Sequence, residues 1–213
     1  ALRLNKIKIN KKKIKSSYRL QIGDEIQIFD ISKFKNNKKS KILKYKPSKK
    51  ELSVYDDYII ENNDNFMVIN KPSGIPVQSG TKSFKNIIDI LKESKFFINY
   101  KPYIVHRLDK ETSGILIIAK KREYAQLFTS LFRLRKIHKT YLAITYGKIP
   151  SKIKVLKDDL VFFENRKKIT QKAVSYIKTI KSNDSYSLVE LKPITGRKHQ
   201  LRKQLLNIGN PIV

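Results

Sequence analysis

The stretch His106-Arg107-Leu108-Asp109-Lys110-Glu111-Thr112-Ser113-Gly114 runs directly into five apolar residues, Ile115–Ala119. A charged segment that ends in Thr-Ser-Gly and continues into an apolar run is typical of a loop that leads into a buried strand. Such a loop would deliver the carboxylate of Asp109 to the start of that strand. Arg107 and Lys110 flank this carboxylate and favour its ionised form, which a nucleophile requires. Taken alone, the nine residues also fit a solvated loop of mixed charge.

Four ordered segments of the sequence resemble the motifs of one family of RNA-modifying enzymes. The stretch 106–114 is similar to the signature of the RluA/RluC/RluD group of RNA pseudouridine synthases. Three further segments resemble the other motifs of this family, namely Glu61–Gly74, Lys139–Ala143 and Thr195–Arg202. The matches cover most of residues 56–213, and the RluC-like branch is favoured. The resemblance implies an isomerase that converts specific uridines of large-subunit (23S) ribosomal RNA to pseudouridine.

Within this resemblance, three residues take catalytic roles. Asp109 falls on the catalytic aspartate and is expected to be the nucleophile, while Tyr141 falls on the active-site tyrosine, against the target base. Arg197 is expected to be the ion-pair partner of Asp109, because a planar guanidinium can bind a carboxylate with two donors. A helix predicted over 197–207 would put Arg197 and Leu201 on one face, so Leu201 is expected to join Tyr141 in the pocket for the base. Without the family, the same spacing fits a core helix with a surface arginine.

Three residues are expected to bind RNA. A uridine inside folded RNA must leave its stack before it reacts, which costs a few kcal/mol. Arg107 is expected to fill the gap and hold the flipped nucleotide, because its flat cationic head can stack between bases. His106 could either shape the loop or contact RNA, and the sequence does not choose between these roles. Arg202, in the last motif, is assigned to RNA binding.

The composition narrows the class of protein. The 213 residues include no cysteine, which excludes disulfides and thiolate metal sites and fits a reducing cytoplasm. Neither a long apolar run nor a charged-then-apolar start is present, so no membrane helix and no signal peptide is expected. The sequence also lacks a P-loop, a Rossmann glycine fingerprint and a metal-ligand cluster, and the isomerisation needs no redox change or group donor. We expect a cytoplasmic monomer without a metal or small-molecule cofactor.

The charge of the chain indicates a polyanionic partner. With 47 Lys and Arg against 18 Asp and Glu, the net charge is +29, which makes nucleic acid the first partner to consider. Lysine is the commoner of the two cations, since only nine residues are arginine. An AT-rich genome is therefore an alternative explanation of the bias. A membrane surface would attract the same charge, but no basic amphipathic helix with a continuous apolar face is present.

The N-terminal region differs from the rest in pattern. Residues 1–32 alternate apolar and basic side chains, which predicts short strands joined by a lysine-rich turn. The pattern resembles the second half of the alpha-L RNA-binding module shared with ribosomal small-subunit protein four. Two helices normally begin that module and none is predicted, so we expect a chain truncated at its start; a simple basic hairpin is the alternative. Residues 33–50 predict a basic linker, and residues 51–213 form the catalytic domain, which we expect to continue beyond the end of this sequence.

The resemblance implies the α+β fold of pseudouridine synthases, a mixed, largely antiparallel sheet with flanking helices. Periodicity and turn residues predict the elements of this domain. Strands are expected over 65–70, 115–119, 140–147, 172–180 and 186–192, a tight structural turn at Lys71–Gly74, and helices from Ser83, over 122–134 and over 197–207. Residues 148–171 are expected to be an irregular surface loop whose Asp158-Asp159 pair has no metal-ligand partners nearby.

Two functions without catalysis are also compatible with the sequence. A basic RNA-binding or ribosome-assembly protein would keep the fold but not the chemistry, and a truncated copy of a synthase would be inactive. The three candidate catalytic residues, Asp109, Tyr141 and Arg197, are all present. Their presence favours the enzyme.

Overall fold

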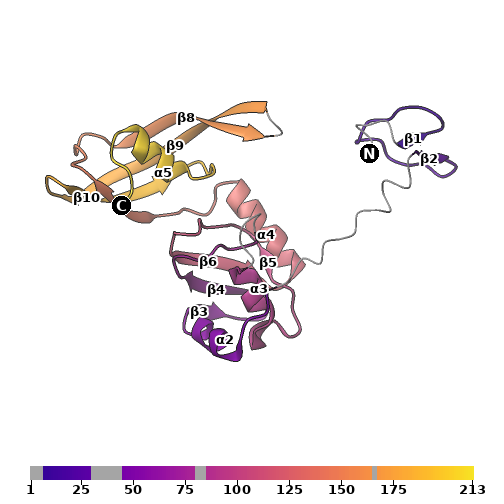
Figure 1. Ribbon diagram of the computed structural model, residues 1–213, viewed down its shortest axis with the longest axis horizontal. Helices are drawn as coiled ribbons and strands as arrows, with labels where there is room; N and C mark the ends of the chain where they lie inside the picture. Colours follow the sequence, from indigo (N-terminus) through magenta and orange to yellow (C-terminus); the bar gives the residue numbers. More distant parts are fainter. Residues whose placement is uncertain (1–6, 30–44, 80–84, 165–166) are drawn as a thin grey trace. The chain divides into compact units, whose positions relative to one another are not determined.

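A computed structural model of the chain describes residues 7–29, 45–79, 85–164 and 167–213. The chain forms two compact units, Ala1–Lys44 and Tyr45–Val213 (Figure 1). Most of the predicted linker and the proposed helix start at Ser83 lie outside the described residues. No helix in the described ranges is both long and apolar enough to cross a bilayer.

The described part of the first unit is a small antiparallel hairpin. Strand β1 (Ile7–Ile9) pairs with β2 (Ile26–Ile28). Asn10 takes a left-handed conformation after β1, with φ of 49°, and its side chain donates a hydrogen bond to the Asp24 carboxylate at 2.8 Å. The strands predicted from the alternating pattern are confirmed. Ile9 is the one buried hydrophobic side chain described in this unit, so the hairpin buries little apolar surface of its own.

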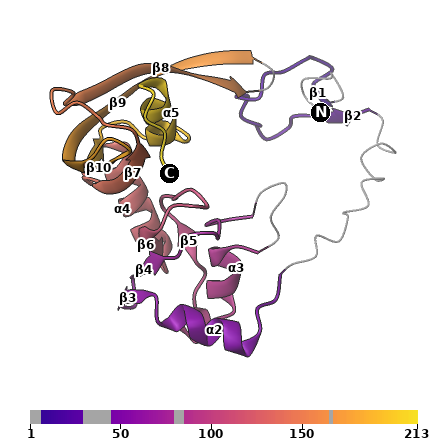
Figure 2. The same cartoon turned by 60° about the vertical axis from the view of Figure 1, so that its left-hand side comes forward.

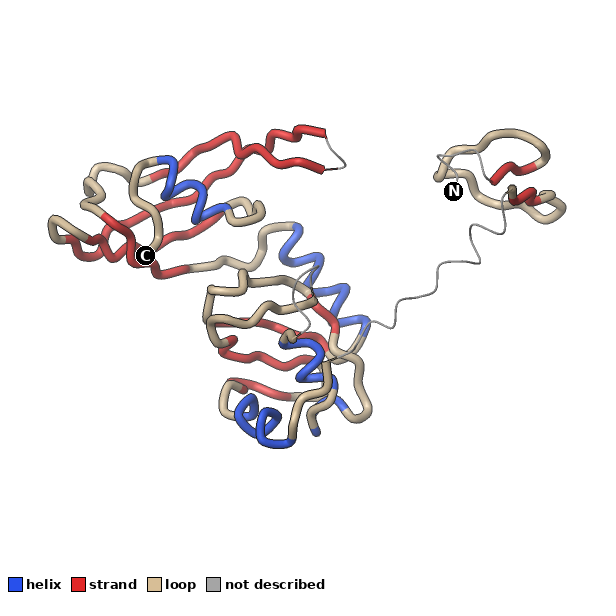
Figure 3. Tube along the Cα trace, in the orientation of Figure 1, coloured by secondary structure: helices blue, strands red, loops and turns tan. Residues whose placement is uncertain are grey.

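The second unit contains two four-stranded sheets, and all their described strand pairs are antiparallel (Figures 2 and 3). The first sheet has the order β3-β4-β6-β5 and the second the order β7-β10-β9-β8. The strands of the first sheet are β3 (Ile59–Asn62), β4 (Phe66–Lys71), β5 (Tyr103–Ile104) and β6 (Gly114–Ala119). Those of the second are β7 (Tyr141–Tyr146), β8 (Val155–Glu164), β9 (Lys167–Ser182) and β10 (Tyr186–Pro193). The expected α+β class is confirmed.

The second unit also contains helices. They are α2 (Lys49–Asp56), α3 (Ile87–Lys92), the short 3₁₀ helix η2 (Lys95–Phe97), α4 (Arg122–Arg133) and α5 (Gln200–Asn207). Asn86 is the N-cap of helix α3, and its side chain accepts a hydrogen bond from the backbone N–H of Asp89 at 3.0 Å. Helix α4 ends within one residue of its prediction.

Alternating side chains of the strands form two cores. In the first sheet, Met67 and Ile69 of β4 and Leu116 and Ile118 of β6 are almost completely buried. The second core gathers buried residues of the second sheet and Leu205 of α5, which lies against one face of that sheet (Figure 2). The loop between β5 and β6 carries Asp109, whereas β7 belongs to the second sheet, against which α5 packs.

The prediction of an irregular loop over 148–171 is wrong. Residues 155–164 form β8, and β9 begins at Lys167, five residues before its expected start. Alternation is present, since Leu156 and Leu160 are buried, but Asp158 stands on the same side and hides the pattern. Its carboxylate accepts hydrogen bonds from the side chains of Gln204 and Asn207, at 3.0 Å and 2.8 Å, so a charged residue is tolerated on the α5 side of the sheet.

Candidate functional site

The loop that carries Asp109 is tied to the turn after β4 by a buried lysine. Lys71 is completely buried, and its ammonium donates to the carbonyl oxygens of Pro72 at 2.7 Å, Ile75 at 2.8 Å and Lys110 at 3.1 Å. Burial lowers the pKa of Lys71, and the charges of two nearby carboxylates oppose that shift. The Lys-Pro-Ser-Gly turn thus has the structural role predicted for it. It also fixes the backbone one residue after Asp109.

Two side chains of the C-terminal motif meet the Asp109 carboxylate. His199 Nδ1 lies 2.9 Å from Oδ2, and Arg202 Nε lies 3.5 Å from the same oxygen. In the described part of the chain, no hydrogen bond reaches Oδ1. The carboxylate is therefore held through one oxygen, and the other remains available to a substrate.

Arg197 does not form the ion pair predicted for it. Its Nε donates to the carbonyl oxygen of Lys172 at 3.2 Å, and Arg202 is the guanidinium beside Asp109. The prediction is wrong because α5 begins at Gln200 and not at residue 197, so the spacing between Arg197 and the helix is not helical. Arg202 was expected to bind RNA, whereas its ion pair in the structure is with Asp109.

The buried side chain of Gln200 determines this local geometry. Its Oε1 accepts hydrogen bonds from the Arg197 backbone N–H at 3.0 Å and from the Thr195 hydroxyl at 2.8 Å. Its Nε2 donates to the Val174 carbonyl oxygen at 3.2 Å, which ties the turn to β9. His199, just before it, has a left-handed backbone with φ of 53° and ψ of 31°. The chain therefore turns sharply before α5, and His199 reaches Asp109 from this turn.

Tyr141 lies where the two cores meet. It is the first residue of β7 and packs against buried side chains of both clusters. Burial raises the pKa of its phenol, and the charge of Asp109 raises it further, so the phenol is neutral at pH 7. The structure thus places Tyr141 within the electrostatic reach of Asp109. Leu201, half-buried, packs against the second core.

The first two residues of the Asp109 loop, His106 and Arg107, have contrasting surroundings. His106 Nε2 accepts a hydrogen bond from the Ile117 backbone N–H at 2.9 Å, and its ring packs on Phe132 with 4.5 Å between centroids. Burial, with a smaller contribution from the charge of Lys139, lowers the pKa of His106 to about 4, so the imidazole is neutral at pH 7. These contacts favour the loop-shaping role over RNA contact. Arg107 is exposed and has no hydrogen bond or ion pair to any described residue.

Two residues of this region, His199 and Lys139, were not predicted as site residues from the sequence. Lys139 is half-buried, and burial lowers the pKa of its ammonium, as does the charge of Arg135. Its Nζ lies 3.7 Å from the point that a Cβ would occupy at Gly196, so it borders the turn that holds His199. Both residues stand inside the matching motifs, which was the available signal. The direction of the His199 side chain could not be predicted from the motif, since it depends on the turn before α5.

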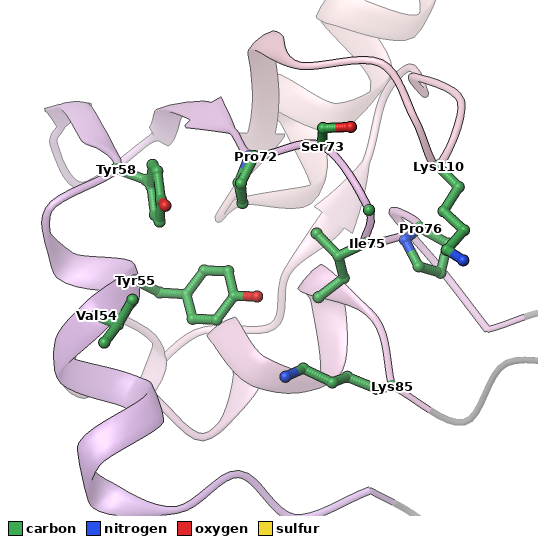
Figure 4. A pocket seen from close by; sticks show the side chains of 10 residues that line it. Val54, Tyr55, Tyr58, Pro72, Ser73, Ile75, Pro76, Lys85 and Lys110 are labelled. Atoms are coloured by element: carbon green, nitrogen blue, oxygen red, sulfur yellow. The ribbon is translucent and has the colours of Figure 1, made fainter.

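A cavity of about 490 Å³ borders the Asp109 loop at Lys110. Figure 4 shows the Tyr55 ring pointing into it, with Pro72 and Lys85 on its walls. Asp109 is not among the residues that line it. This cavity is therefore separate from the carboxylate, although the two features share one loop.

The chemistry that this site can perform follows from the groups around Asp109. No cluster of three or more His, Cys, Asp or Glu side chains able to hold a metal ion is present in the described ranges. The carboxylate instead contacts the imidazole of His199 and the guanidinium of Arg202, and its charge acts on the neutral phenol of Tyr141. Such a set can hold a carboxylate in a fixed orientation for nucleophilic attack beside an aromatic surface.

The sequence model of the family described as RNA pseudouridylate synthase matches residues 65–207. The chain belongs to this family. Members are isomerases that act on RNA, and the matched range includes Asp109, Tyr141 and Arg202.

Individual relatives agree with the family match. The chain is 34% identical over its whole length to the "Ribosomal large subunit pseudouridine synthase C" of Buchnera aphidicola subsp. Baizongia pistaciae, of which it covers 68%. The protein of the same name from Escherichia coli K12 is 31% identical over 99% of this chain, which covers 67% of it. The solved structure titled "Human RNA Pseudouridylate Synthase Domain Containing 4" is 32% identical and superposes with a TM-score of 0.63, over 76% of this chain and 68% of that one.

Proposed function

We propose that this RNA pseudouridine synthase isomerises specific uridines of large-subunit ribosomal RNA and belongs to the RluC-like branch. The names of its relatives support the substrate. The single observation that carries the chemistry is the Asp109 carboxylate, held through Oδ2 by His199 and Arg202 on a loop that Lys71 ties in place.

In the proposed reaction, Asp109 acts as the nucleophile through Oδ1. This oxygen attacks an electron-poor carbon of the uridine, the glycosidic bond between N1 and C1′ breaks, and the base turns within the site. A new bond forms between C5 and C1′, and the bond between Oδ1 and the attacked carbon breaks, which returns Asp109 to a free carboxylate. C5 loses its proton, and N1 gains one. Arg202 supports the charge of the carboxylate in the role first expected of Arg197.

Three other residues serve binding in this proposal. Tyr141 stacks on the uracil, and its neutral phenol can donate a hydrogen bond to the base. Leu201 adds apolar surface beside it. Arg107, exposed at the start of the loop, fills the space left by the flipped nucleotide.

The remainder of the chain adds affinity for RNA. We assign residues 1–32 to a partial RNA-binding module of the alpha-L type, residues 33–50 to a basic linker, and residues 51–213 to the catalytic domain. The antiparallel hairpin β1-β2 is compatible with such a module. With a net charge of +29, binding should weaken steeply as salt is added. The enzyme is proposed to act as a monomer in the cytoplasm, where it participates in ribosome biogenesis.

The test is chemical mapping of pseudouridine in unmodified large-subunit rRNA incubated with the protein or with Asp109→Asn. We expect the parent to modify defined sites and Asp109→Asn to bind the RNA without modifying it. If a folded parent binds RNA but modifies no uridine, the proposed function is wrong and a non-catalytic RNA-binding role takes its place.

A further inference from the structure

We propose that His199 is a positioning residue for the Asp109 carboxylate. Its Nδ1–H donates to Oδ2 and so turns Oδ1 toward the substrate. This inference deepens the proposed function and rests on it, because it assumes that Asp109 is the nucleophile. His199 would act through Asp109 and not by contact with the uridine.

The contact between His199 and Asp109 has the geometry of a hydrogen bond. A separation of 2.9 Å is the usual length of a hydrogen bond, whereas the 3.5 Å between Arg202 Nε and the same oxygen is the distance of a looser ion pair. His199 therefore sets the direction of the carboxylate, and Arg202 contributes mainly charge. Because an ionised carboxylate only accepts hydrogen bonds, Nδ1 of His199 must carry the proton.

The backbone of His199 also supports a positioning role. A left-handed conformation is uncommon for a residue with a Cβ, and such strain persists only where the surrounding structure imposes it. Here the buried Gln200 imposes it through its bonds to Thr195, Arg197 and Val174. The imidazole of His199 does not cap the helix that follows. Its one side-chain hydrogen bond among the described residues is the bond to Asp109. The left-handed residue closes the turn before α5, where the Gln200 N–H donates to the Arg197 carbonyl oxygen at 3.1 Å, and the same turn brings a donor to the carboxylate. An uncommon backbone conformation thus stands at the residue that holds Asp109.

The Asp109 carboxylate is partly exposed to water. The Asp109 side chain is 29% exposed and that of His199 is 46% exposed, so water can compete for the carboxylate from the open side. Without a fixed donor, a partly hydrated carboxylate would sample several orientations, and misplacement of a reacting group by about 1 Å can lower a rate by about 100-fold.

Three variants of His199, with one control, separate the loss of its hydrogen-bond donor from the loss of its left-handed backbone conformation. His199→Gly keeps the left-handed conformation and removes the donor, whereas His199→Asn tolerates that conformation and retains a short N–H donor. His199→Ala lacks the donor and disfavours the conformation. Lys198→Ala is the matched control, because Lys198 is exposed in the same turn and has no hydrogen bond or ion pair with the described residues.

Single-turnover pseudouridine formation on an rRNA fragment, RNA affinity and thermal unfolding would be measured for each variant. We expect His199→Gly to lower the rate constant at saturating RNA by about 10- to 100-fold, with RNA affinity and melting temperature near those of the parent. His199→Asn should recover most of the rate, and Lys198→Ala should retain it. Equal rates for parent and His199→Gly would overturn the proposal, as would a loss confined to RNA affinity or equal losses in His199→Gly and His199→Asn.

A spectroscopic arm tests the contact even if no uridine is modified. The chain has three histidines, so the imidazole signals of ¹⁵N-histidine-labelled protein can be assigned by single substitutions. We expect His199 to show a protonated Nδ1 whose resonance shifts in Asp109→Ala, while the signals of His106 and His138 stay in place. A His199 signal that ignores Asp109→Ala overturns the inference. An inactive parent with the expected shift would instead overturn the proposed function and leave the contact established.

Discussion

The two segments that meet at Asp109 are fixed by opposite chemical means. The loop 106–114 is held by a buried ammonium, since Lys71 donates to three backbone carbonyl oxygens, and by His106, which accepts a hydrogen bond as a neutral imidazole. The turn 195–199 is held by the neutral amide of Gln200, which both donates and accepts. An amide satisfies donors and acceptors at once, whereas an ammonium suits a site made of carbonyls alone.

Structural support and chemistry fall on different residues in both segments. In each segment a buried residue fixes the backbone, and a half-exposed neighbour presents the chemistry: Lys71 supports Asp109, and Gln200 supports His199. Loss of a supporting residue should therefore lower stability and disturb the group that it holds, whereas loss of a presented residue should lower the rate with little change in stability.

The largest effect should separate the two arginines of the C-terminal turn. Arg202→Ala removes the guanidinium beside Asp109 and should lower the single-turnover rate constant by about 100- to 1,000-fold, or roughly 3–4 kcal/mol in activation free energy. Arg197→Ala removes a hydrogen bond to the Lys172 carbonyl and should change the rate by less than about threefold. Chemical mapping over a time course measures both. The assignment of Arg202 fails if Arg197→Ala is the more damaging variant.

The sequence predicted the position of Asp109 but not which of the two arginines lies beside it. The motif and the apolar run after it placed Asp109 correctly, one loop before a buried strand. The last motif was interpreted as one continuous helix, because periodicity does not reveal a left-handed residue such as His199. The turn depends on bonds from Gln200 to residues of β9, about 25 positions away in the chain, and local patterns carry no such information.

The strands follow the same rule. β4, β6 and β7 were predicted almost to the residue, because their apolar alternation or continuous apolar run is undisturbed. β8 was missed because Asp158 interrupts the alternation, and its partners Gln204 and Asn207 lie on α5. In both the fold and the site, the wrong predictions thus fall on polar residues whose hydrogen-bond partners lie far away in the sequence.

The next effect concerns the buried ammonium. Lys71→Met keeps much of the side-chain volume but leaves buried carbonyl oxygens without a donor, so it should lower the free energy of unfolding by about 3 kcal/mol. Urea denaturation measures the change. Lys95→Met is the control, since Lys95 forms an exposed ion pair with Asp56 and its loss should cost less than about 1 kcal/mol. Equal losses in the two variants would mean that the Asp109 loop does not depend on Lys71.

The histidine at the start of the same loop should make stability depend on pH. The pKa of His106 is about 4 in the folded protein against an ordinary 6.5, so folding favours the neutral ring. Its contribution is complete above pH 6.5 and is lost as the pH falls toward 4, by roughly 2–3 kcal/mol. Comparison of urea midpoints at several pH values for the parent and His106→Gln tests this. The parent should lose more stability than the variant across that window, and parallel curves would contradict a buried neutral His106.

The smallest of these effects should come from the amide that holds the turn. Gln200→Leu removes the hydrogen bonds of a buried side chain but keeps its apolar contacts, so we expect a loss of about 2 kcal/mol in the free energy of unfolding. Gln126→Leu on the exposed face of α4 is the matched control, with a change below about 0.5 kcal/mol. If Gln200 imposes the left-handed turn, its loss should also lower the rate constant as much as His199→Gly does, and combining both changes should lower the rate little further. Additive losses would show that His199 reaches Asp109 without help from Gln200, and the parallel between the loop and the turn would then fail.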